Sequence, residues 1–267
     1  MSAVLIDISD GIATITLNRP ASLNALTRDD YDAFANGLRE IDKREDVVVT
    51  VWQATGRWFC AGTDIKDSST ADSADPAAWT VRGRFTQTVA HTAVDCGHAL
   101  ASHSKILVAA LNGPVMAFLG HFDFIYCLPS AWLSVPFSLL GIVAEGGSSV
   151  SFINRMGTAK ATEALLYGRK QTVEQLLHCG FINEVFPASN VDDFHAAVRK
   201  RILDDIDGLD HTALLGTRKL LRTALHERNN PDAANLRESY AQAERFASGT
   251  PTERFGKIAR REIKHKL

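Results

Sequence analysis

The sequence predicts an α/β protein in which strands and helices alternate and a helical region follows. Residues 47–52 and 105–111 are nearly all apolar, as expected for strands buried on both faces, and a helical pattern lies between them. A strand, a helix and a second strand in that order form a right-handed crossover, so we expect a parallel sheet. From residue 190 onward the strand pattern does not recur, and three helices are expected at 190–206, 210–226 and 231–247.

The composition supports a folded core and disfavours several classes of protein. With 267 residues and a 45% hydrophobic content, the chain can form one large domain or two small ones. Its formal net charge of −2 gives no broad electrostatic footprint for nucleic acid or an anionic membrane. No window reaches 18 uninterrupted apolar residues, and the N-terminus lacks the features of a signal peptide. We therefore expect a soluble protein that is not secreted and does not insert into a membrane.

The cysteines indicate neither a disulfide framework nor a metal site. The four residues, Cys60, Cys96, Cys127 and Cys179, are widely spaced, with no C-x-x-C pair and no histidine cluster at zinc spacing. We expect reduced thiols in the core of an intracellular protein rather than disulfides, and no bound metal.

Local signals place the first elements of the chain. Val4–Ile8 and Ile12–Leu17 are β-branched runs on either side of a Ser-Asp-Gly turn, which predicts an antiparallel hairpin. Thr27, followed three residues later by Asp30, resembles a capping arrangement, and apolar residues then recur at helical spacing. A helix is therefore expected over 28–43.

The middle of the chain predicts further elements. Residues 67–75 are mostly Ser, Thr, Asp and Ala, which predicts a mobile loop. A long helix is expected over 79–102, with an apolar face formed by Val81, Phe85, Val89, Ala93 and Cys96. Shorter elements follow: strands at 124–127, 132–135 and 181–186, a helix from Thr158 to Tyr167 and another from Thr172 to Gly180.

One carboxylate is placed unusually, in the segment Pro136–Ser149. Glu145 follows an apolar run and precedes two glycines and two hydroxyl residues that could open a helix. Burial makes a charged carboxylate costly and raises its pKa, which suits a general base. The alternative is a solvated glutamate on a surface loop.

Two glycine-containing turns follow predicted buried strands, at Phe59–Lys66 and Asn112–Gly120. Where a strand ends and a helix begins, backbone N–H groups lack intrahelical partners. Two such turns on neighbouring strands could aim two N–H groups at one oxygen, which would form an oxyanion hole. The alternative is a pair of ordinary turns at strand ends.

Several motifs together resemble those of the enoyl-CoA hydratase/isomerase (crotonase) superfamily, and the match covers nearly the whole chain. They are Ile-Thr-Leu-Asn-Arg-Pro-x-x-x-Asn-Ala-Leu at 15–26, Ala-Gly-x-Asp at 61–64, Asn-Gly-Pro at 112–114 and Pro-Phe-x-x-Leu-Gly-Ile-x-x-Glu-Gly-Gly at 136–147. The segment around Glu145 most resembles the fungal-type peroxisomal Δ3,Δ2-enoyl-CoA isomerases.

The resemblance implies a fold and a set of site residues. It implies a crotonase-like spiral of repeated ββα units over residues 1–189 and a helical region over 190–267 that covers the CoA site and forms homotrimers or hexamers. By motif position, the N–H groups of Thr63 and Phe118 are the oxyanion donors and Glu145 is the base. Six residues match positions that line the CoA site in relatives: Asn24, Ala25, Ala61, Asp64, Ile65 and Lys66.

The implied activity is isomerisation of 3-enoyl-CoA to 2-trans-enoyl-CoA in fatty acid β-oxidation. The implied substrate is a fatty acyl-CoA bound in bent form, and no separate cofactor is needed because coenzyme A is part of it. One carboxylate can remove a C2 proton and return one at C4, through a dienolate whose charge collects on the thioester oxygen. The alternatives are another crotonase-type enzyme, such as a hydratase or a biosynthetic enoyl-CoA enzyme, and a CoA-binding relative without turnover.

Hydration is disfavoured because hydratase relatives use two glutamates. Here Phe137 occupies one of those positions and His121 lies nearest the other. The chain is shorter than such relatives between Asn112 and Asp123, which leaves the register of Phe118 open. A histidine beside phenylalanines on a short helix is more often a packed core residue than a catalytic one, and we expect the former for His121.

The C-terminal residues His265-Lys266-Leu267 resemble the Ser-Lys-Leu type of peroxisomal address. We therefore expect import into the peroxisomal matrix through the receptor for that address, with the cytosol as the alternative. The basic residues between 254 and 266 fit either a solvated helix face or a phosphate contact, and the same two interpretations apply to Lys66.

Overall fold

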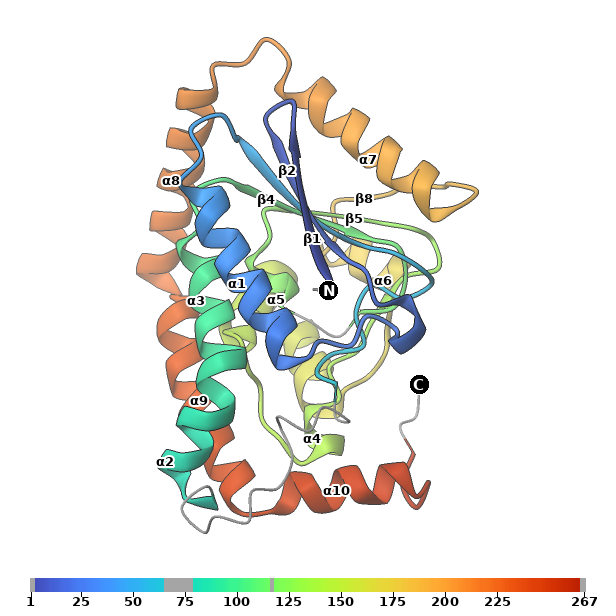
Figure 1. Ribbon diagram of the computed structural model, residues 1–267, viewed down its shortest axis with the longest axis vertical. Coiled ribbons are helices and arrows are strands. Elements are labelled where there is room, and N and C mark those ends of the chain that lie inside the picture. Colours follow the sequence, from blue (N-terminus) through green and yellow to red (C-terminus); the bar gives the residue numbers. More distant parts are fainter. Residues whose placement is uncertain (1–2, 65–78, 116–117, 265–267) are drawn as a thin grey trace.

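The computed structural model describes residues 3–64, 79–115 and 118–264, and its centre is a mixed β-sheet (Figure 1). Six strands lie in the order β1-β2-β3-β4-β5-β8. Their bounds are Val4–Ser9 (β1), Ile12–Leu17 (β2), Val49–Ala54 (β3), Ile106–Leu111 (β4), Phe124–Cys127 (β5) and Glu184–Val185 (β8).

The sheet begins with the predicted hairpin. β1 and β2 pair antiparallel, and Asp10 and Gly11 in their turn have φ values of 52° and 75°. Two consecutive positive φ values are typical of two-residue hairpin turns, and Asp and Gly tolerate them. All later neighbours in the sheet pair in parallel, as the alternation of strands and helices predicted.

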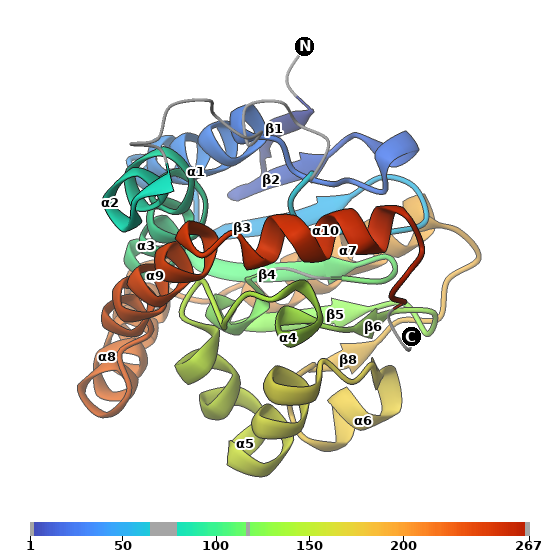
Figure 2. The same cartoon turned by 90° about the horizontal axis from the view of Figure 1, so that it is seen from below.

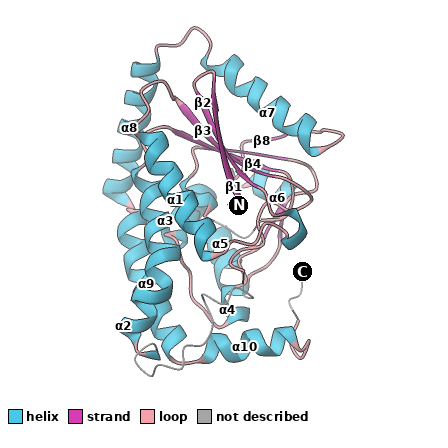
Figure 3. Ribbon diagram, viewed as in Figure 1, coloured by secondary structure: helices cyan, strands magenta, loops and turns pink. Residues whose placement is uncertain are grey.

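Helices cover both faces of the sheet, as a parallel sheet requires (Figure 3). α1 (Arg28–Asp42) and α3 (Asp95–Ser102) pack on one face, and α7 (Val191–Ile206) packs on the other. α1 begins with the predicted capping box: Thr27 accepts a hydrogen bond from the N–H of Asp30, and the Asp30 carboxylate accepts one from the N–H of Thr27.

With α7, the other helices complete the three expected in the C-terminal region and add one more, α10. Their bounds are Val81–Arg84 (α2), Phe137–Leu140 (α4), Ser148–Tyr167 (α5), Val173–His178 (α6), His211–Arg228 (α8), Pro231–Ala247 (α9) and Thr250–Ala259 (α10). Figure 2 shows α10 crossing one end of the molecule and α8 at its periphery. Within the described ranges, no helix combines the length and apolar composition needed to cross a bilayer.

A second, smaller layer joins the turns that follow the main strands. β6 (Trp132–Leu133) pairs antiparallel with β7 (Gln171–Thr172). Three single parallel bridges extend this layer: Leu26 with Thr63, Cys60 with Val115, and Val115 with Leu133. Successive turns of the chain therefore lie side by side, which brings the two glycine-containing turns together at one end of the sheet.

The helix expected over 79–102 is not a continuous α-helix. A π-helical segment, Phe85–Val94, separates α2 from α3. The expected apolar face repeats every four residues, which is wider than the α-helical period of 3.6, and the wider turn of a π-helix fits that spacing. Val89, Ala93 and Cys96 are buried as expected, whereas Val81 is 39% exposed.

Three other boundaries differ from the prediction. The helix expected from Thr158 is the second half of α5, which begins at Ser148 and is broken at Gly157, where φ is 75°. The strand expected at 132–135 is shorter and pairs with β7 rather than within the main sheet. Only two residues of the strand expected at 181–186 join that sheet, as β8. The predicted loop at 67–75 lies outside the described residues.

Candidate active site

A cavity of about 860 Å³ brings the predicted catalytic residues together. Its wall is formed by the two glycine-containing turns, the segment around Glu145, the π-helix, and helices α9 and α10. Thr63, Phe118 and Glu145 all line it, as do Ala25, Ala61 and Asp64 from the predicted CoA site. Most other lining side chains are apolar, including Val89, Val135, Phe137, Leu140, Ile142, Phe152, Phe246, Phe255 and Ile258.

Glu145 lies in the irregular segment between α4 and α5. α4 ends at Gly141 (φ 77°), and two further glycines with positive φ, Gly146 and Gly147, redirect the chain into α5. The Glu145 side chain is partly exposed toward the cavity, and its Oε2 accepts a hydrogen bond of 2.9 Å from Nε2 of Gln242. The glutamate is therefore part of the cavity wall and is not on a solvated surface loop.

The surroundings of Glu145 raise its pKa to about 7. Burial among apolar side chains is the largest cause, because it disfavours the charged form. The hydrogen bond from Gln242 lowers the pKa by stabilising the carboxylate, and the negative charge of Glu238 raises it. A carboxyl group with a pKa near neutrality can both accept a proton and return it.

Glu238 is a second carboxylate near Glu145, but it does not line the cavity. Its side chain is buried, and its two oxygens accept hydrogen bonds from the N–H groups of Gly147 (2.7 Å) and Ser149 (2.8 Å). These N–H groups open α5, so Glu238 caps that helix from another part of the chain. Both oxygens are engaged, which leaves Glu145 as the carboxylate that faces the cavity from this side.

The first oxyanion turn leaves the N–H of Thr63 free to act as a donor. In the bridge between Leu26 and Thr63, the hydrogen bonds run from Leu26 N–H to Gly62 C=O and from Asp64 N–H to Leu26 C=O. No acceptor among the described residues takes the N–H of Thr63. The Thr63 hydroxyl bonds to the hydroxyl of Tyr31 at 2.7 Å, which fixes its rotamer.

The second glycine-containing turn packs directly on the segment that carries Glu145. Phe118 lines the cavity, and its ring lies so close to Gly146 that a Cβ there would be 2.1 Å from the ring. The N–H of Phe118 likewise has no acceptor among the described residues. Phe118 and Thr63 thus both line the cavity and both have a backbone N–H with no acceptor among the described residues, and their role as oxyanion donors stays a prediction.

His121 is a buried packing residue, as expected, and not a group on the cavity wall. Its Nε2 donates a 2.7 Å hydrogen bond to the carbonyl of Gly146, which assigns the proton to Nε2. Burial lowers the pKa of His121 to about 4, so the ring is neutral near pH 7. Phe137 lines the cavity, so neither position that matches a hydratase glutamate carries a carboxylate.

The predicted CoA-site residues divide into three groups. Ala25, Ala61 and Asp64 line the cavity, and an Oδ2 of Asp64 pairs with the Arg19 guanidinium at 3.2 Å. Asn24 is buried and does not line it; its amide bonds to the backbone of Arg19, Thr55 and Trp58 and so holds the loop in place. Ile65 and Lys66 lie outside the described residues, so their assignment stays a prediction.

Three side chains around Glu145 and Thr63 were not anticipated as site residues from the sequence. Tyr31 lies in the predicted helix 28–43, yet it lines the cavity, and burial and then the charge of Glu145 raise its pKa well above the ordinary value. Gln242 and Glu238 lie in a helix with many charged residues and gave no signal of their own. The contacts of both with the Glu145 segment join residues about one hundred positions apart, which periodicity does not detect.

The four cysteines are free thiols, and Cys60, Cys96 and Cys127 are buried, as expected. Among the described residues, no group of three or more His, Cys, Asp or Glu side chains is arranged to hold a metal ion.

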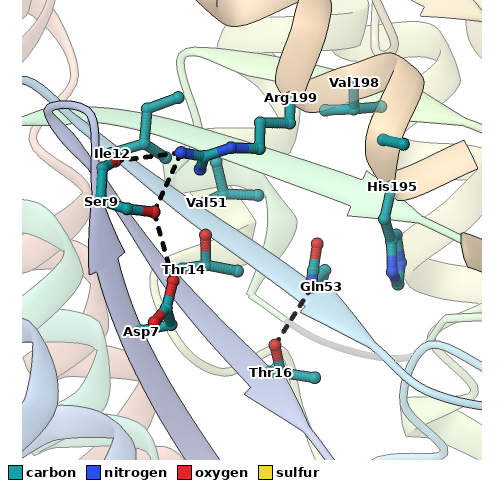
Figure 4. Close-up of a pocket in the computed structure, with 11 residues that line it drawn as sticks. Asp7, Ser9, Ile12, Thr14, Thr16, Val51, Gln53, His195, Val198 and Arg199 are labelled. Carbon is teal, nitrogen blue, oxygen red and sulfur yellow. Dashed lines mark hydrogen bonds between the residues drawn. The ribbon is translucent and has the colours of Figure 1, made fainter.

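A smaller cavity of about 290 Å³ lies between the sheet and α7 (Figure 4). It contains none of the predicted site residues. Its polar groups largely bond to each other: Arg199 donates to the carbonyl and hydroxyl of Ser9, and Gln53 donates to Thr16. The three predicted catalytic residues line the larger cavity instead.

Comparisons with known proteins give matches that cover nearly the whole chain. Residues 7–250 match the family model described as enoyl-CoA hydratase/isomerase. The Delta(3,5)-Delta(2,4)-dienoyl-CoA isomerase of Pyricularia oryzae is 37% identical over 270 residues, which cover 96% of each chain. The 3,2-trans-enoyl-CoA isomerase of Saccharomyces cerevisiae is 30% identical over 264 residues, covering 95% of this chain and 92% of the relative.

The fold has close counterparts among solved structures. The crystal structure of an enoyl-CoA hydratase/isomerase from Pseudoalteromonas atlantica has a TM-score of 0.80 at 25% identity and covers all of both chains. Sequence motifs, architecture and the relatives agree. The chain belongs to the enoyl-CoA hydratase/isomerase (crotonase) family.

Proposed function

We propose that this protein is a Δ3,Δ2-enoyl-CoA isomerase that converts 3-enoyl-CoA to 2-trans-enoyl-CoA in fatty acid β-oxidation. The observation that carries the proposal is the pattern of carboxylates on the cavity. Among the described lining residues only Asp64 and Glu145 are acidic, and Asp64 is paired with Arg19. A single available base suits an isomerisation, in which one proton is removed and one is returned.

In the proposed mechanism, the Glu145 carboxylate removes the C2 proton of the acyl thioester. The resulting dienolate places negative charge on the thioester oxygen, which accepts hydrogen bonds from the N–H groups of Thr63 and Phe118. By analogy with other oxyanion holes, each donor lowers the barrier by about 3–4 kcal/mol. Protonated Glu145 then returns the proton at C4, which restores the carboxylate.

The apolar part of the cavity suits a fatty acyl chain. The side chains from 135–142 and from α10 form an apolar wall beyond Glu145. Ala25, Ala61 and Asp64 also line the cavity, and there we place the pantetheine and nucleotide of CoA, with Ile65 and Lys66 as further contacts. The thioester then lies between the acyl chain and CoA, beside Glu145, and the bent form of the acyl-CoA is taken from the family resemblance.

A dienoyl-CoA isomerase is the second candidate, because the Pyricularia oryzae relative that is 37% identical has that name. That reaction also begins with loss of a C2 proton, but the proton is returned at a more distant carbon. Glu145 and the two amides would serve both reactions, so the difference lies in how far the base can reach.

The test is a side-by-side assay of the purified protein on 3-hexenoyl-CoA, 2-hexenoyl-CoA and a 3,5-dienoyl-CoA. We expect conversion of 3-hexenoyl-CoA to 2-trans-hexenoyl-CoA, and loss of that activity in Glu145→Gln by at least about 10³-fold with acyl-CoA binding retained. Hydration of 2-hexenoyl-CoA, or undiminished turnover in the variant, would refute the proposal. Faster turnover of the dienoyl substrate would favour the second candidate.

We also propose that the 190–267 region, set apart from the 1–189 core, assembles the protein into homotrimers or hexamers. Its support is the row of exposed leucines on α8, of which Leu220 and Leu221 are 72% and 68% exposed.

Import into the peroxisomal matrix, with the cytosol as the alternative, is proposed on the His265-Lys266-Leu267 signal, which lies outside the described residues. A mouse relative, 30% identical over 274 residues, is named Enoyl-CoA delta isomerase 3, peroxisomal. Imaging a fluorescent fusion with and without these three residues tests the proposal.

A further inference from the structure

Helix α9 forms hydrogen bonds with the segment Gly141–Ser149, which carries Glu145. The bonds reach every second residue of this segment: Gly141, Val143, Glu145, Gly147 and Ser149. They come from three side chains of α9: Arg245 Nε donates to the Gly141 carbonyl (2.9 Å), Gln242 bonds to Val143 and Glu145, and Glu238 accepts from Gly147 and Ser149.

The three side chains lie along one face of α9, because residues 238, 242 and 245 are four and three apart. The segment that they contact is irregular: Gly141, Gly146 and Gly147 have positive φ, and Ser149 lies in the first turn of α5. One face of α9 can therefore contact the whole segment from Gly141 to Ser149, with Gln242 at the centre, opposite Glu145.

The amide of Gln242 has only one orientation that satisfies both of its contacts. Its Oε1 accepts a 3.1 Å hydrogen bond from the N–H of Val143, so its Nε2 must point toward Oε2 of Glu145. Gln242 is 1% exposed, so no water competes for either group. The two carboxylate oxygens of Glu145 are thereby made different: Oε2 is held, and Oε1 is left to the cavity.

We propose that Gln242 is the positioning residue of the active site: it holds Oε2 of Glu145 so that Oε1 alone exchanges protons with the substrate, and Glu238 and Arg245 fix the segment on either side. The assignment of the proton transfer to Glu145 rests on the proposed function. The positioning itself is a property of the protein without substrate.

The charged groups around Glu145 predict opposite effects for two neighbouring substitutions. Glu238 on α9 raises the pKa of Glu145, Glu145 in turn raises the pKa of Tyr31 on α1, and Asp64 and Arg84 lie on the same cavity wall. Removing the hydrogen bond from Gln242 destabilises the carboxylate and should raise its pKa. Removing the negative charge of Glu238 should lower it.

The experiment is a titration of the Glu145 carboxyl carbon by NMR in the full-length protein, assigned with Glu145→Gln. In Gln242→Met we expect the pKa of Glu145 to rise, and in Glu238→Gln to fall. The acid limb of the pH–rate profile should move the same way, since the base acts when ionised. We expect kcat of Gln242→Met to fall about 10-fold or more, with KM for acyl-CoA changed less than about 3-fold.

Asn235→Ala is the matched control, because Asn235 is also a buried amide on α9 but bonds to the carbonyls of Ala93 and Val94. Loss of the Asn235 amide should lower the free energy of unfolding and leave the pKa of Glu145 unchanged. If Gln242→Met folds poorly, Gln242→Glu keeps an acceptor for Val143 and should raise the pKa of Glu145 further, because it adds a like charge.

The inference is overturned if Gln242→Met and Gln242→Glu leave the titration of Glu145 unmoved, or if Asn235→Ala lowers kcat and moves the titration as much as Gln242→Met does. Absence of isomerase activity in the unmodified protein would refute the proposed function instead. The NMR titration would still decide whether Gln242 positions Glu145.

Discussion

Helices α8 and α9 are neighbours of similar length and similar polar composition, yet they have different roles. α8 (18 residues) buries Arg218 alone among its residues, whereas α9 (17 residues) buries seven. Four of the seven are polar: Asn235, Glu238, Ser239 and Gln242. Burying a polar group is costly unless it is hydrogen-bonded, and Asn235, Glu238 and Gln242 each bond to residues outside α9.

The exposed face of α8 shows the reverse pattern. Leu220, Leu221 and Leu225 are 72%, 68% and 42% exposed, while Arg218 attaches the helix to the rest of the protein through Asp123 and the carbonyl of His103. The comparison shows that the share of polar residues in a helix does not decide which of its residues are buried or what the helix contacts. In our proposals, α9 supports the active site with buried polar residues, and α8 offers an apolar surface to a second subunit.

The largest expected effect on stability comes from Glu238 of α9. Glu238→Ala leaves the N–H groups of Gly147 and Ser149 buried without an acceptor, which should lower the free energy of unfolding by about 2–3 kcal/mol. Urea denaturation measures this. Glu244→Ala, on the exposed side of the same helix, is the control and should stay within about 0.5 kcal/mol of the unmodified protein. Equal effects would remove the distinction between the two sides of α9.

A second prediction concerns pH. The pKa of Glu145 is about 7 in the folded protein and near its ordinary 4.5 when unfolded, so the folded state binds the proton more tightly. Stability from this group is present below about pH 4.5 and is lost as the pH rises through about 7. Glu145→Gln should therefore match the unmodified protein at pH 4.5 and exceed it by about 2–3 kcal/mol at pH 8.

Denaturation curves of the two proteins across that pH range would check the prediction. A difference that does not grow with pH would mean that the environment made by α9 and the cavity does not raise the pKa of Glu145. The same experiment on Leu221→Glu should show no such trend, since α8 does not contact Glu145.

The smallest effect on the subunit is expected on α8. Leu221→Glu removes an exposed apolar side chain, so the free energy of unfolding of the subunit should change by no more than about 0.5 kcal/mol. Light scattering after gel filtration should nevertheless show smaller particles, because a charge is introduced into the proposed contact. Leu177→Glu, a 46% exposed leucine on α6, should leave the assembly intact. If both substitutions behave alike, α8 is not the assembly surface.

Elements with local signals were predictable from the sequence. The hairpin at Asp10 and Gly11 and the capping box of Thr27 are determined by residues within a few positions of each other. The family motifs also identified Glu145, Thr63 and Phe118, which the fold brings to one cavity. Glu145 could be singled out because an isolated carboxylate after an apolar run is unusual.

The supporting residues could not be predicted in this way. Gln242 and Glu238 act across about one hundred positions of sequence, and their neighbours on α9 are ordinary charged residues. Tyr31 has the spacing of a core residue and is one, but its hydroxyl also reaches Thr63. The π-helix was missed because a four-residue apolar repeat does not distinguish a wide turn from an α-helix.

The contact between the Phe118 ring and Gly146 has a consequence for the reaction itself. Phe118, which we propose as an oxyanion donor, touches the backbone next to Glu145, the proposed base, with no room for a side chain between them. The Phe118 ring therefore sets the spacing between the proposed oxyanion donor and Glu145. In any acyl thioester, the carbonyl oxygen and C2 are a fixed distance apart. A rigid contact between Phe118 and Gly146 can keep the donor and the base at the matching distance, whatever the length of the acyl chain.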